Sequence, residues 1–261
     1  MVIEDAVTSP TGTQAVDRAA SLLRQVVDAS EPVTFSELTA SAGLAKSTAS
    51  RLLVALERNG LVRRDRNGAF GPGEVFVRFA WRGDGDAALV ELAMPYLEEL
   101  GRLTGETINL GVANGSMVEQ VAQVDSRYLL GGANWIGRPV PLHCTALGKV
   151  LVAFGGAELP PGRLERRTPR TITTRAALEA DLAEVRRRGW AATVEELEPG
   201  LVAVAAPVHR SAGSVVAALS VSGPTSRLDA AHLAGIAARC VEQATALSAR
   251  LGHRPRREGA A

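Results

Sequence analysis

Hydrophobic positions in the N-terminal part of the chain recur every three to four residues, which is the period of an amphipathic helix. Thr34 is positioned to cap the second of three such segments, and Gly43 follows that segment as a left-handed terminator. Glu31-Pro32 interrupts the pattern after the first segment, and Asn59-Gly60 ends the third. We therefore expect helices over residues 14–29, 35–41 and 45–59.

The segment after the third helix has the pattern of a small β-hairpin. A short strand over residues 61–64 is followed by turn residues and by a return strand that begins at Ala69. Three helices followed by a hairpin is the order of a winged helix-turn-helix. We therefore assign residues 14–83 to a DNA-binding domain of this class and residues 1–13 to a disordered tail.

The third predicted helix has one apolar and one polar face. Ala49, Leu52, Leu53 and Leu56 share the apolar face, which must pack on the core of the domain. The opposite face is then the one that enters the major groove of DNA, with its N-terminal residues nearest the base edges. Arg51 on this face can pair bidentately with guanine, and an exposed Val54 can contact a thymine methyl group.

Positive charge is concentrated in the same part of the chain. Residues 44–73 hold six basic and two acidic residues, whereas the whole chain has a formal net charge of only +1. A basic amphipathic helix alone is as often a solvated surface helix, but the helix order, the hairpin and the local charge together favour contact with DNA phosphates. The expected DNA-contacting residues are Lys46, Ser47, Thr48, Ser50, Arg51, Arg58, Arg63, Arg64 and Arg66.

A second domain follows the polar, glycine-containing segment 83–86. Residues 84–104 have the pattern of a linker helix with Pro95 inside it, and its apolar face either pairs with another chain or packs within its own. Residues 105–251 mix helical and strand patterns, which indicates an α+β effector-binding domain with an antiparallel sheet, and residues 252–261 form a basic tail. Strands are expected over 107–113, 117–124, 190–194, 201–208 and 215–221, and helices over 146–154, 175–188 and 228–251.

Composition narrows the class of protein. A chain of 261 residues exceeds one typical domain, and 46% hydrophobic with 22% charged residues is ordinary for a globular protein. The sequence has no run of about 18–20 apolar residues that would span a bilayer, and its start lacks the basic-then-apolar order of a signal peptide. Its two cysteines, Cys144 and Cys240, exclude a disulfide scaffold and fit a reducing interior, so we expect a cytoplasmic protein.

Residues 143–149 carry the most distinctive local chemistry. A loop enters a short helix here, so we expect unsatisfied backbone amides near residues 145–148, which favour a bound carboxylate or phosphate. The pair Gly148-Lys149 is not a P-loop, because that motif needs a glycine five residues earlier and a hydroxyl residue after the lysine. His143 and Cys144 lack an orienting carboxylate, and the histidines lack metal-ligand spacing. We therefore expect no catalytic residue, no metal and no cofactor.

Seven motifs, taken in order, resemble the IclR (isocitrate lyase regulator) family of bacterial transcription factors. They are QAVDRAASLL, LAKSTASRLLVALERNGLV, TGETINLGV, PLHCTALGKVLVAF, RRRGWAATVEE, EPGLVAVAAPV and ALSVSGP, and the resemblance covers nearly all of residues 14–251. It implies a winged helix-turn-helix, a linker helix and a GAF-like effector domain. It also implies a dimer or tetramer that binds a palindromic operator in double-stranded DNA.

The resemblance further implies where an effector pocket lies. Some relatives have a cysteine or another polar residue where this chain has Val202-Ala203, so the pocket is expected to be more apolar at that point. Ser220 and Ser222 also fit a simpler interpretation, in which they only alternate along a strand. The implied effector-binding residues are Leu129, Leu130, Ile136, Thr145, Ala146, Leu147, Thr193, Ala203, Ser220 and Ser222.

These observations predict a ligand-responsive transcriptional regulator, a repressor more readily than an activator, and not an enzyme. The predicted effector is a small organic metabolite, either a carboxylate or a polyol. The alternative from another class is a small-molecule enzyme built on the GAF-like domain, whose N-terminal module serves only to dimerise the chain.

Overall fold

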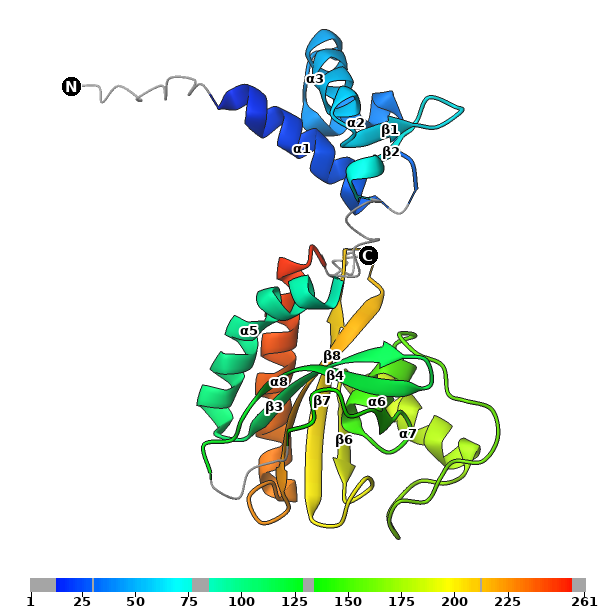
Figure 1. The fold of residues 1–261 in the computed structure, drawn as a ribbon, viewed down its shortest axis with the longest axis vertical. Helices are drawn as coiled ribbons and strands as arrows, with labels where there is room; N and C mark the ends of the chain where they lie inside the picture. Colours follow the sequence, from blue (N-terminus) through cyan, green and yellow to red (C-terminus); the bar gives the residue numbers. More distant parts are fainter. Residues whose placement is uncertain (1–12, 30, 77–84, 129–133, 212, 255–261) are drawn as a thin grey trace, which may run out of the picture. The chain divides into compact units, whose positions relative to one another are not determined.

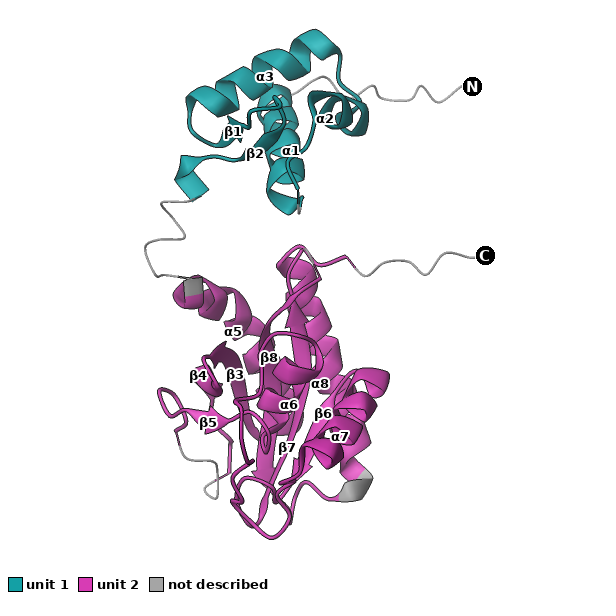
Figure 2. Ribbon diagram, turned by 90° about the vertical axis from the view of Figure 1, so that its right-hand side faces the viewer, with its two compact units in different colours: residues 1–85 teal, residues 86–261 magenta. Residues whose placement is uncertain are grey.

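The computed structural model describes residues 13–29, 31–76, 85–128, 134–211 and 213–254. These residues form two compact units, one within Met1–Gly85 and one within Asp86–Ala261 (Figure 2). The division falls inside the glycine-containing segment 83–86. Each unit has hydrophobic packing of its own and is described by itself.

The first unit contains three helices and a two-stranded hairpin. Helix boundaries predicted from the sequence differ from the observed ones by one residue at most. The helices are α1 (Gln14–Asp28), α2 (Phe35–Ala42) and α3 (Lys46–Arg58), and the strands are β1 (Val62–Arg64) and β2 (Phe70–Pro72).

Helix α2 begins and ends at the residues that the sequence indicates. The hydroxyl of Thr34 accepts a hydrogen bond from the backbone N–H of Glu37 (3.3 Å), and the Glu37 carboxylate accepts one from the backbone N–H of Thr34 (2.8 Å). This reciprocal pair is a capping box. Gly43 then ends the helix with φ +61°, a left-handed conformation that costs glycine little. The turn from Gly43 leads directly into α3 and completes a helix-turn-helix.

The core of the first unit lies where the helices meet the hairpin. Leu22 of α1, Leu38 of α2, Leu53 of α3 and Phe70 of β2 are fully buried there. The backbone of Phe70 also exchanges two hydrogen bonds with Val33 (2.9 and 2.8 Å), so an extended segment before α2 pairs with the hairpin. The hairpin, or wing, is therefore fixed to the helices through Phe70.

The second unit is built on an antiparallel sheet of six strands in the order β5-β4-β3-β8-β7-β6. Helices α5 and α8 cover one face of the sheet, and α6 and α7 cover the other (Figure 1). This is the predicted α+β architecture with an antiparallel sheet. The elements are α5 (Gly85–Thr104), β3 (Thr107–Asn114), β4 (Met117–Val124), β5 (Val140–Pro141), α6 (Ala146–Ala153), α7 (Arg175–Arg188), β6 (Ala191–Val194), β7 (Leu201–His209), β8 (Val215–Pro224) and α8 (Ala230–Arg250).

Strand β8 shows how the sheet separates two hydrophobic cores. Leu219 and Val221 pack in the core that includes α5 and α8, whereas Ala218 packs in the core that includes α6 and α7. Ser220 and Ser222 share the face of Ala218 by alternation, and both are buried. The sheet therefore presents hydroxyl groups on the face that α6 covers.

Helix α5 packs within its own chain. Ala93, Leu97 and Leu100 have no exposed surface and join the core that also contains Cys240 of α8. Pro95 lies inside the helix without ending it. Of the two interpretations of its apolar face, the structure supports burial within the chain, since α5 belongs to the second unit. Neither α5 nor any other described helix is long and apolar enough to cross a membrane.

Two features of the sheet differ from the sequence-based expectation. Strand β5 contains only Val140 and Pro141, which is too short for a period-two pattern to reveal. Strand β8 continues to Pro224, beyond the predicted end at residue 221, because Leu201 and Val202 of β7 pair with its last residues.

Candidate DNA-binding surface and effector cavity

Helix α3 is oriented as its pattern predicts. Ala49 and Leu53 have no exposed surface and Leu56 is buried, so this face packs on the core of the first unit. Leu52, the fourth predicted residue of this face, is half-buried against the same core. The opposite face is exposed, and Val54 on it keeps 49% of its surface accessible. Of the polar residues that the sequence nominates on this helix, Thr48 is half-buried and the exposed ones are Lys46, Ser47, Ser50, Arg51 and Arg58.

The wing carries three exposed arginines with different surroundings. The guanidinium of Arg64 lies 3.2 Å from the Glu57 carboxylate of α3 and 4.6 Å from the centre of the Phe70 ring. Arg63 Nε donates to the carbonyl oxygen of Pro72 (3.2 Å), across the hairpin. Arg66 lies exposed in the turn, where the Asp65 carboxylate accepts hydrogen bonds from nearby backbone amides. Arg64 therefore ties the wing to α3, whereas Arg66 extends from its tip.

The second unit contains a cavity between α6 and the sheet face that carries Ser220 and Ser222. The volume of this cavity is about 40 Å³, which leaves room for roughly three water molecules. None of the described residues that line it is charged. The sequence-nominated residues that line this cavity are Thr145, Ala146, Leu147, Thr193, Ala203, Ser220 and Ser222.

The remaining nominated residues are not part of the described cavity wall. Ile136 is 50% exposed and is not among the described residues that line the cavity, so its role in an apolar wall stays a prediction. The neighbouring Trp135 does line the cavity, and its backbone N–H donates to Gln123 Oε1 of β4 (2.9 Å). Leu129 and Leu130 lie outside the described residues.

Two buried amides in the cavity wall were missed by the sequence analysis. Asn109 of β3 and Gln120 of β4 are 3% and 5% exposed, and neither Asn109 Oδ1 nor Gln120 Oε1 has a hydrogen-bond partner. Asn109 Nδ2 donates to Ser222 Oγ (3.4 Å), so this amide is oriented by the adjacent strand. The other cavity residues that sequence reasoning missed are Trp135, Val140, Leu197 and Leu201.

A β-bulge directs Gln120 into the cavity. Leu110 pairs with Ala122 but the next residue, Gly111, pairs with Gln120, so Val121 is an extra residue in β4. A bulge of this kind changes the face to which the following side chains point. Ala122 consequently packs in the core with α5 and α8, whereas residues 118 and 120 face α6. Strict alternation along β4 would have put residues 118, 120 and 122 on one face.

The start of α6 is partly capped by its own side chain. Thr145 Oγ1 accepts a hydrogen bond from the backbone N–H of Gly148 (3.1 Å) and donates to the Pro141 carbonyl (2.7 Å). The expectation that the Gly148 amide is unsatisfied was therefore wrong. The first intrahelical bond is made by Lys149, to the Thr145 carbonyl (2.9 Å), so the amides of Ala146 and Leu147 precede the helical ladder. Both residues line the cavity.

Gly148 has a packing role. A Cβ at this position would overlap the backbone of Leu142, so only glycine lets α6 approach the segment before it. The resemblance of Gly148-Lys149 to a phosphate-binding motif is therefore explained by close backbone approach.

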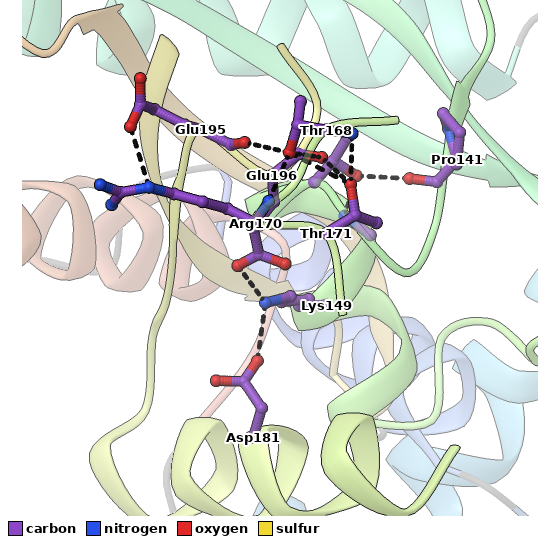
Figure 3. A network of polar contacts seen from close by, with 10 residues as sticks. Pro141, Lys149, Thr168, Arg170, Thr171, Asp181, Glu195 and Glu196 are labelled. Carbon is purple, nitrogen blue, oxygen red and sulfur yellow. Dashed lines mark hydrogen bonds and ion pairs between the residues drawn. The ribbon is translucent and has the colours of Figure 1, made fainter. Parts of the chain in front are cut away.

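Lys149 forms a buried ion-pair network beside the cavity (Figure 3). Its ammonium lies 2.6 Å from Glu196 Oε1 and 2.8 Å from Asp181 Oδ2, and its side chain has no exposed surface. Burial raises the pKa of Glu196 above its ordinary value, and the charge of Lys149 acts in the opposite direction. The network joins α6, α7 and the segment between β6 and β7.

Two threonines hold the same segment between β6 and β7. Thr168 Oγ1 donates to the Glu195 carbonyl (2.6 Å), and Thr171 Oγ1 donates to the Glu196 carbonyl (2.7 Å) (Figure 3). Glu195 has φ +57°, an unfavourable conformation for a residue with a side chain. Leu197, the next residue after the ion pair, lines the cavity. The network therefore fixes part of the cavity wall.

The cysteine environments favour inert thiols. Burial raises the pKa of Cys144 to about 11 and that of Cys240 to about 12. Both thiols are therefore protonated near neutral pH and are weak nucleophiles. His143 Nε2 contacts the Glu165 carbonyl (2.8 Å). Among the described residues, no group of histidine, cysteine and acidic side chains could hold a metal ion.

A helix-turn-helix joined to a second unit with a polar cavity defines the chain as a DNA-binding regulator with an effector-binding domain. The IclR helix-turn-helix domain matches residues 15–66, and the C-terminal domain of the bacterial transcriptional regulator IclR matches residues 85–249. The chain belongs to the IclR family of bacterial transcriptional regulators.

Known regulators are similar to this protein over nearly its whole chain. The HTH-type transcriptional regulator BhcR of Paracoccus denitrificans is 35% identical over 260 residues, which cover 95% of this chain and 90% of that protein. The crystal structure of Thermotoga maritima IclR has a TM-score of 0.60 at 26% identity and covers 92% of this chain and 100% of its own. The crystal structure of the Agobacterium tumefaciens repressor BlcR has a TM-score of 0.61 at 25% identity and covers 92% of this chain and 98% of its own. The curated relatives are named as transcriptional regulators and not as enzymes.

Proposed function

We propose that this protein is a ligand-responsive repressor, which binds a palindromic operator through α3 and senses a small metabolite in the cavity beside α6. The observation that carries the proposal is the uncharged cavity lined by buried hydroxyl and amide groups, which adjoins the first turn of α6. Small-molecule sites typically combine an apolar wall with a few convergent polar groups of this kind. The repressor role takes support from the name of the similar protein BlcR.

The DNA-binding part of the proposal rests on the exposed face of α3. Lys46, Ser47 and Arg51 lie toward its N-terminal end, which is the part of a recognition helix closest to the base edges. Arg51 is suited to guanine, whose O6 and N7 accept two hydrogen bonds in the major groove. Val54 supplies an exposed apolar group for a thymine methyl. The arginines of the wing supply sequence-independent contacts with phosphates.

A symmetric assembly follows from the small size of one such surface. A single recognition helix makes too few base contacts for useful discrimination against other genomic sites. We therefore propose a dimer or tetramer that presents pairs of α3 helices to the two halves of a palindrome in cytoplasmic DNA.

The effector part of the proposal rests on the polar groups of the cavity. A carboxylate at the start of α6 would accept hydrogen bonds from the amides of Ala146 and Leu147 and gain from the helix dipole. The hydroxyls of Thr193, Ser220 and Ser222 would orient the rest of a small carboxylate or polyol. Such a ligand regulates DNA binding only if its affinity differs between two conformations of the protein.

Footprinting on the DNA upstream of the protein's own gene tests the DNA-binding proposal. We expect a protected palindrome whose half-sites are about 10 base pairs apart, or a multiple of that spacing. Light scattering of the same preparation should give a dimer or tetramer. A monomer in solution that protects no discrete site would contradict the proposal.

A further inference from the structure

We infer that the cavity selects a short hydroxy acid, meaning a carboxylate that carries one or two hydroxyl groups on a chain of about three or four carbon atoms. This inference rests on the proposed effector site and names the chemistry of its ligand. It is carried by the two unpartnered amide oxygens, Asn109 Oδ1 and Gln120 Oε1, in the cavity wall.

The two amide oxygens require hydrogen-bond donors. Both side chains are more than nine-tenths buried, so bulk water does not satisfy them. An unpaired buried acceptor keeps its full desolvation cost, and a ligand that donates to it removes that cost. A hydroxyl group is the neutral donor that matches an amide carbonyl, whereas a keto or ether oxygen brings a second acceptor to the same place.

The opposite polarity lies at the start of α6. The amides of Ala146 and Leu147 are donors that precede the helical ladder, and the positive end of the helix dipole adds to their preference for an anion. The cavity therefore offers donors at the helix and acceptors at Asn109 and Gln120. A molecule with a carboxylate at one end and hydroxyls at the other satisfies both groups.

The absence of charge in the wall decides against a cationic donor. An ammonium group could also donate to two amide oxygens, but none of the described lining residues is a carboxylate that would compensate its charge. The dipole of α6 opposes a cation as well. The cavity volume of about 40 Å³ favours a ligand with a short carbon chain. A short hydroxy acid fits these constraints better than an amino acid does.

The two amides reach the cavity by a route that depends on this sequence. Asn109 shares its strand face with Gly111, and the bulge at Val121 brings Gln120 opposite that glycine. Any Cβ at residue 111 would meet Val118 and Leu147, so the glycine keeps this side of the cavity open. Asn109 and Gln120 are therefore specificity-determining residues on neighbouring strands, β3 and β4 (Figure 1).

Isothermal titration calorimetry of the full chain with five matched probes tests the inference. The probes are glycerate, propanoate without hydroxyls, pyruvate with a carbonyl in place of a hydroxyl, glycerol without a carboxylate, and serine with an ammonium group. We expect glycerate to bind at least about tenfold more tightly than each of the others. Propanoate and pyruvate lack a hydroxyl donor for the amide oxygens, glycerol lacks the anion for the helix amides, and serine brings an ammonium charge that no described lining residue compensates. This comparison uses the unmodified protein and needs no variant to fold.

Two variants assign the preference to the amides. Asn109→Leu and Gln120→Met keep the side-chain volume and remove the acceptor, so the advantage of glycerate over propanoate should fall to about twofold or less. Asn114→Leu makes the same change at the exposed end of β3 and should keep the full advantage. Thermal melting of each variant verifies that it is folded.

The outcomes separate this inference from the proposed effector site. If any of the other four probes binds as tightly as glycerate, or if none of the five binds, the inference is overturned. Ala203→Leu fills the cavity. If another probe binds more tightly than glycerate and Ala203→Leu abolishes the binding of that probe, the proposed effector site stands but the hydroxyl preference does not. If Ala203→Leu binds every probe unchanged, the cavity is not the effector site and the proposed function fails at that point.

Discussion

Lys149 of α6 and Glu196, which follows β6, form a buried ion pair with 2.6 Å between Nζ and Oε1. The lysine side chain has no exposed surface and that of Glu196 is 11% exposed. Asp181 of α7 completes the network at 2.8 Å but remains 28% exposed. The pair adjoins the cavity through Leu197, so it connects stability of the second unit with the shape of the effector site.

We predict that Lys149→Met lowers the free energy of unfolding by about 3–5 kcal/mol, because it leaves the Glu196 carboxylate buried without its partner. Urea denaturation measures this change. The double variant Lys149→Met with Glu196→Gln should lose less than the single variant, since only the more exposed Asp181 carboxylate then lacks its partner. A single variant within about 1 kcal/mol of the unmodified chain would contradict the role assigned to the pair.

The pH dependence of the same variant follows from the raised pKa of Glu196. Burial raises this pKa, and Lys149→Met removes the charge that opposes the rise. A carboxyl group with a raised folded-state pKa contributes stability below its unfolded pKa, and that stability is lost as the pH rises through the folded-state value. The loss in free energy of unfolding caused by Lys149→Met should therefore be smaller near pH 5 than near pH 8 in urea titrations. An equal deficit at both pH values would show that Glu196 is not the group responsible.

Arg51→Ala should weaken binding to the specific operator by about 1–3 kcal/mol and relax the sequence preference at one position in each half-site. The physical reason is the loss of a bidentate contact with a base edge. Fluorescence anisotropy on the operator and on single-base variants measures both effects. Unchanged discrimination by Arg51→Ala would mean that another face of α3 meets the bases.

Substitutions in the wing should separate phosphate contact from structural support. Arg66→Ala should weaken binding to all DNA sequences equally. It should also reduce the slope of log binding constant against log salt concentration by about one unit. Arg64→Ala should do the same and also lower the melting temperature, because Arg64 contacts both Glu57 and Phe70. Glu57→Gln is the matched control, since it removes the ion pair but leaves the positive charge on the wing. If Glu57→Gln weakens DNA binding as strongly as Arg64→Ala, the phosphate role of Arg64 is wrong.

The two thiols should resist alkylation in the folded chain at pH 8, because burial raises their pKa to about 11 for Cys144 and about 12 for Cys240. Mass spectrometry after iodoacetamide treatment, with and without urea, measures this protection. A thiol with a raised folded-state pKa contributes stability below its unfolded pKa and loses it as pH rises toward the folded value. Alkaline destabilisation should thus be smaller in Cys144→Ala and Cys240→Ala. Rapid labelling of either native thiol would contradict their description as buried, inert thiols.

Local signals were sufficient to predict the first unit. The cap at Thr34 and the terminator at Gly43 act through hydrogen bonds within four residues, so their consequence for α2 can be inferred from the sequence alone. The apolar period of α3 likewise depends only on neighbours along one helix, and Ala49, Leu53 and Leu56 are buried as predicted.

The missed features depend on residues that are distant in sequence or on an irregular register. Lys149 pairs with Glu196, 47 residues away, and no local pattern indicates that partner. Regular alternation along β4 would put Val118, Gln120 and Ala122 on one face of the sheet. The bulge at Val121 instead places Gln120 and Ala122 on opposite faces. Period-two reasoning assumes an unbroken ladder, so it fails at a bulge and misses the amide that lies in the cavity.

The most direct test of the account is the coupling between the cavity and the operator. Operator affinity is measured by anisotropy without ligand and with saturating amounts of whichever acid binds most tightly among glycerate, propanoate and pyruvate. We predict a change of about fivefold or more, and linkage requires the operator to change the affinity for the acid by the same factor. The combined variant Ser220→Ala and Ser222→Ala should lose this coupling and keep its ligand-free affinity for the operator. The account is contradicted if the acid occupies the cavity and operator affinity does not change.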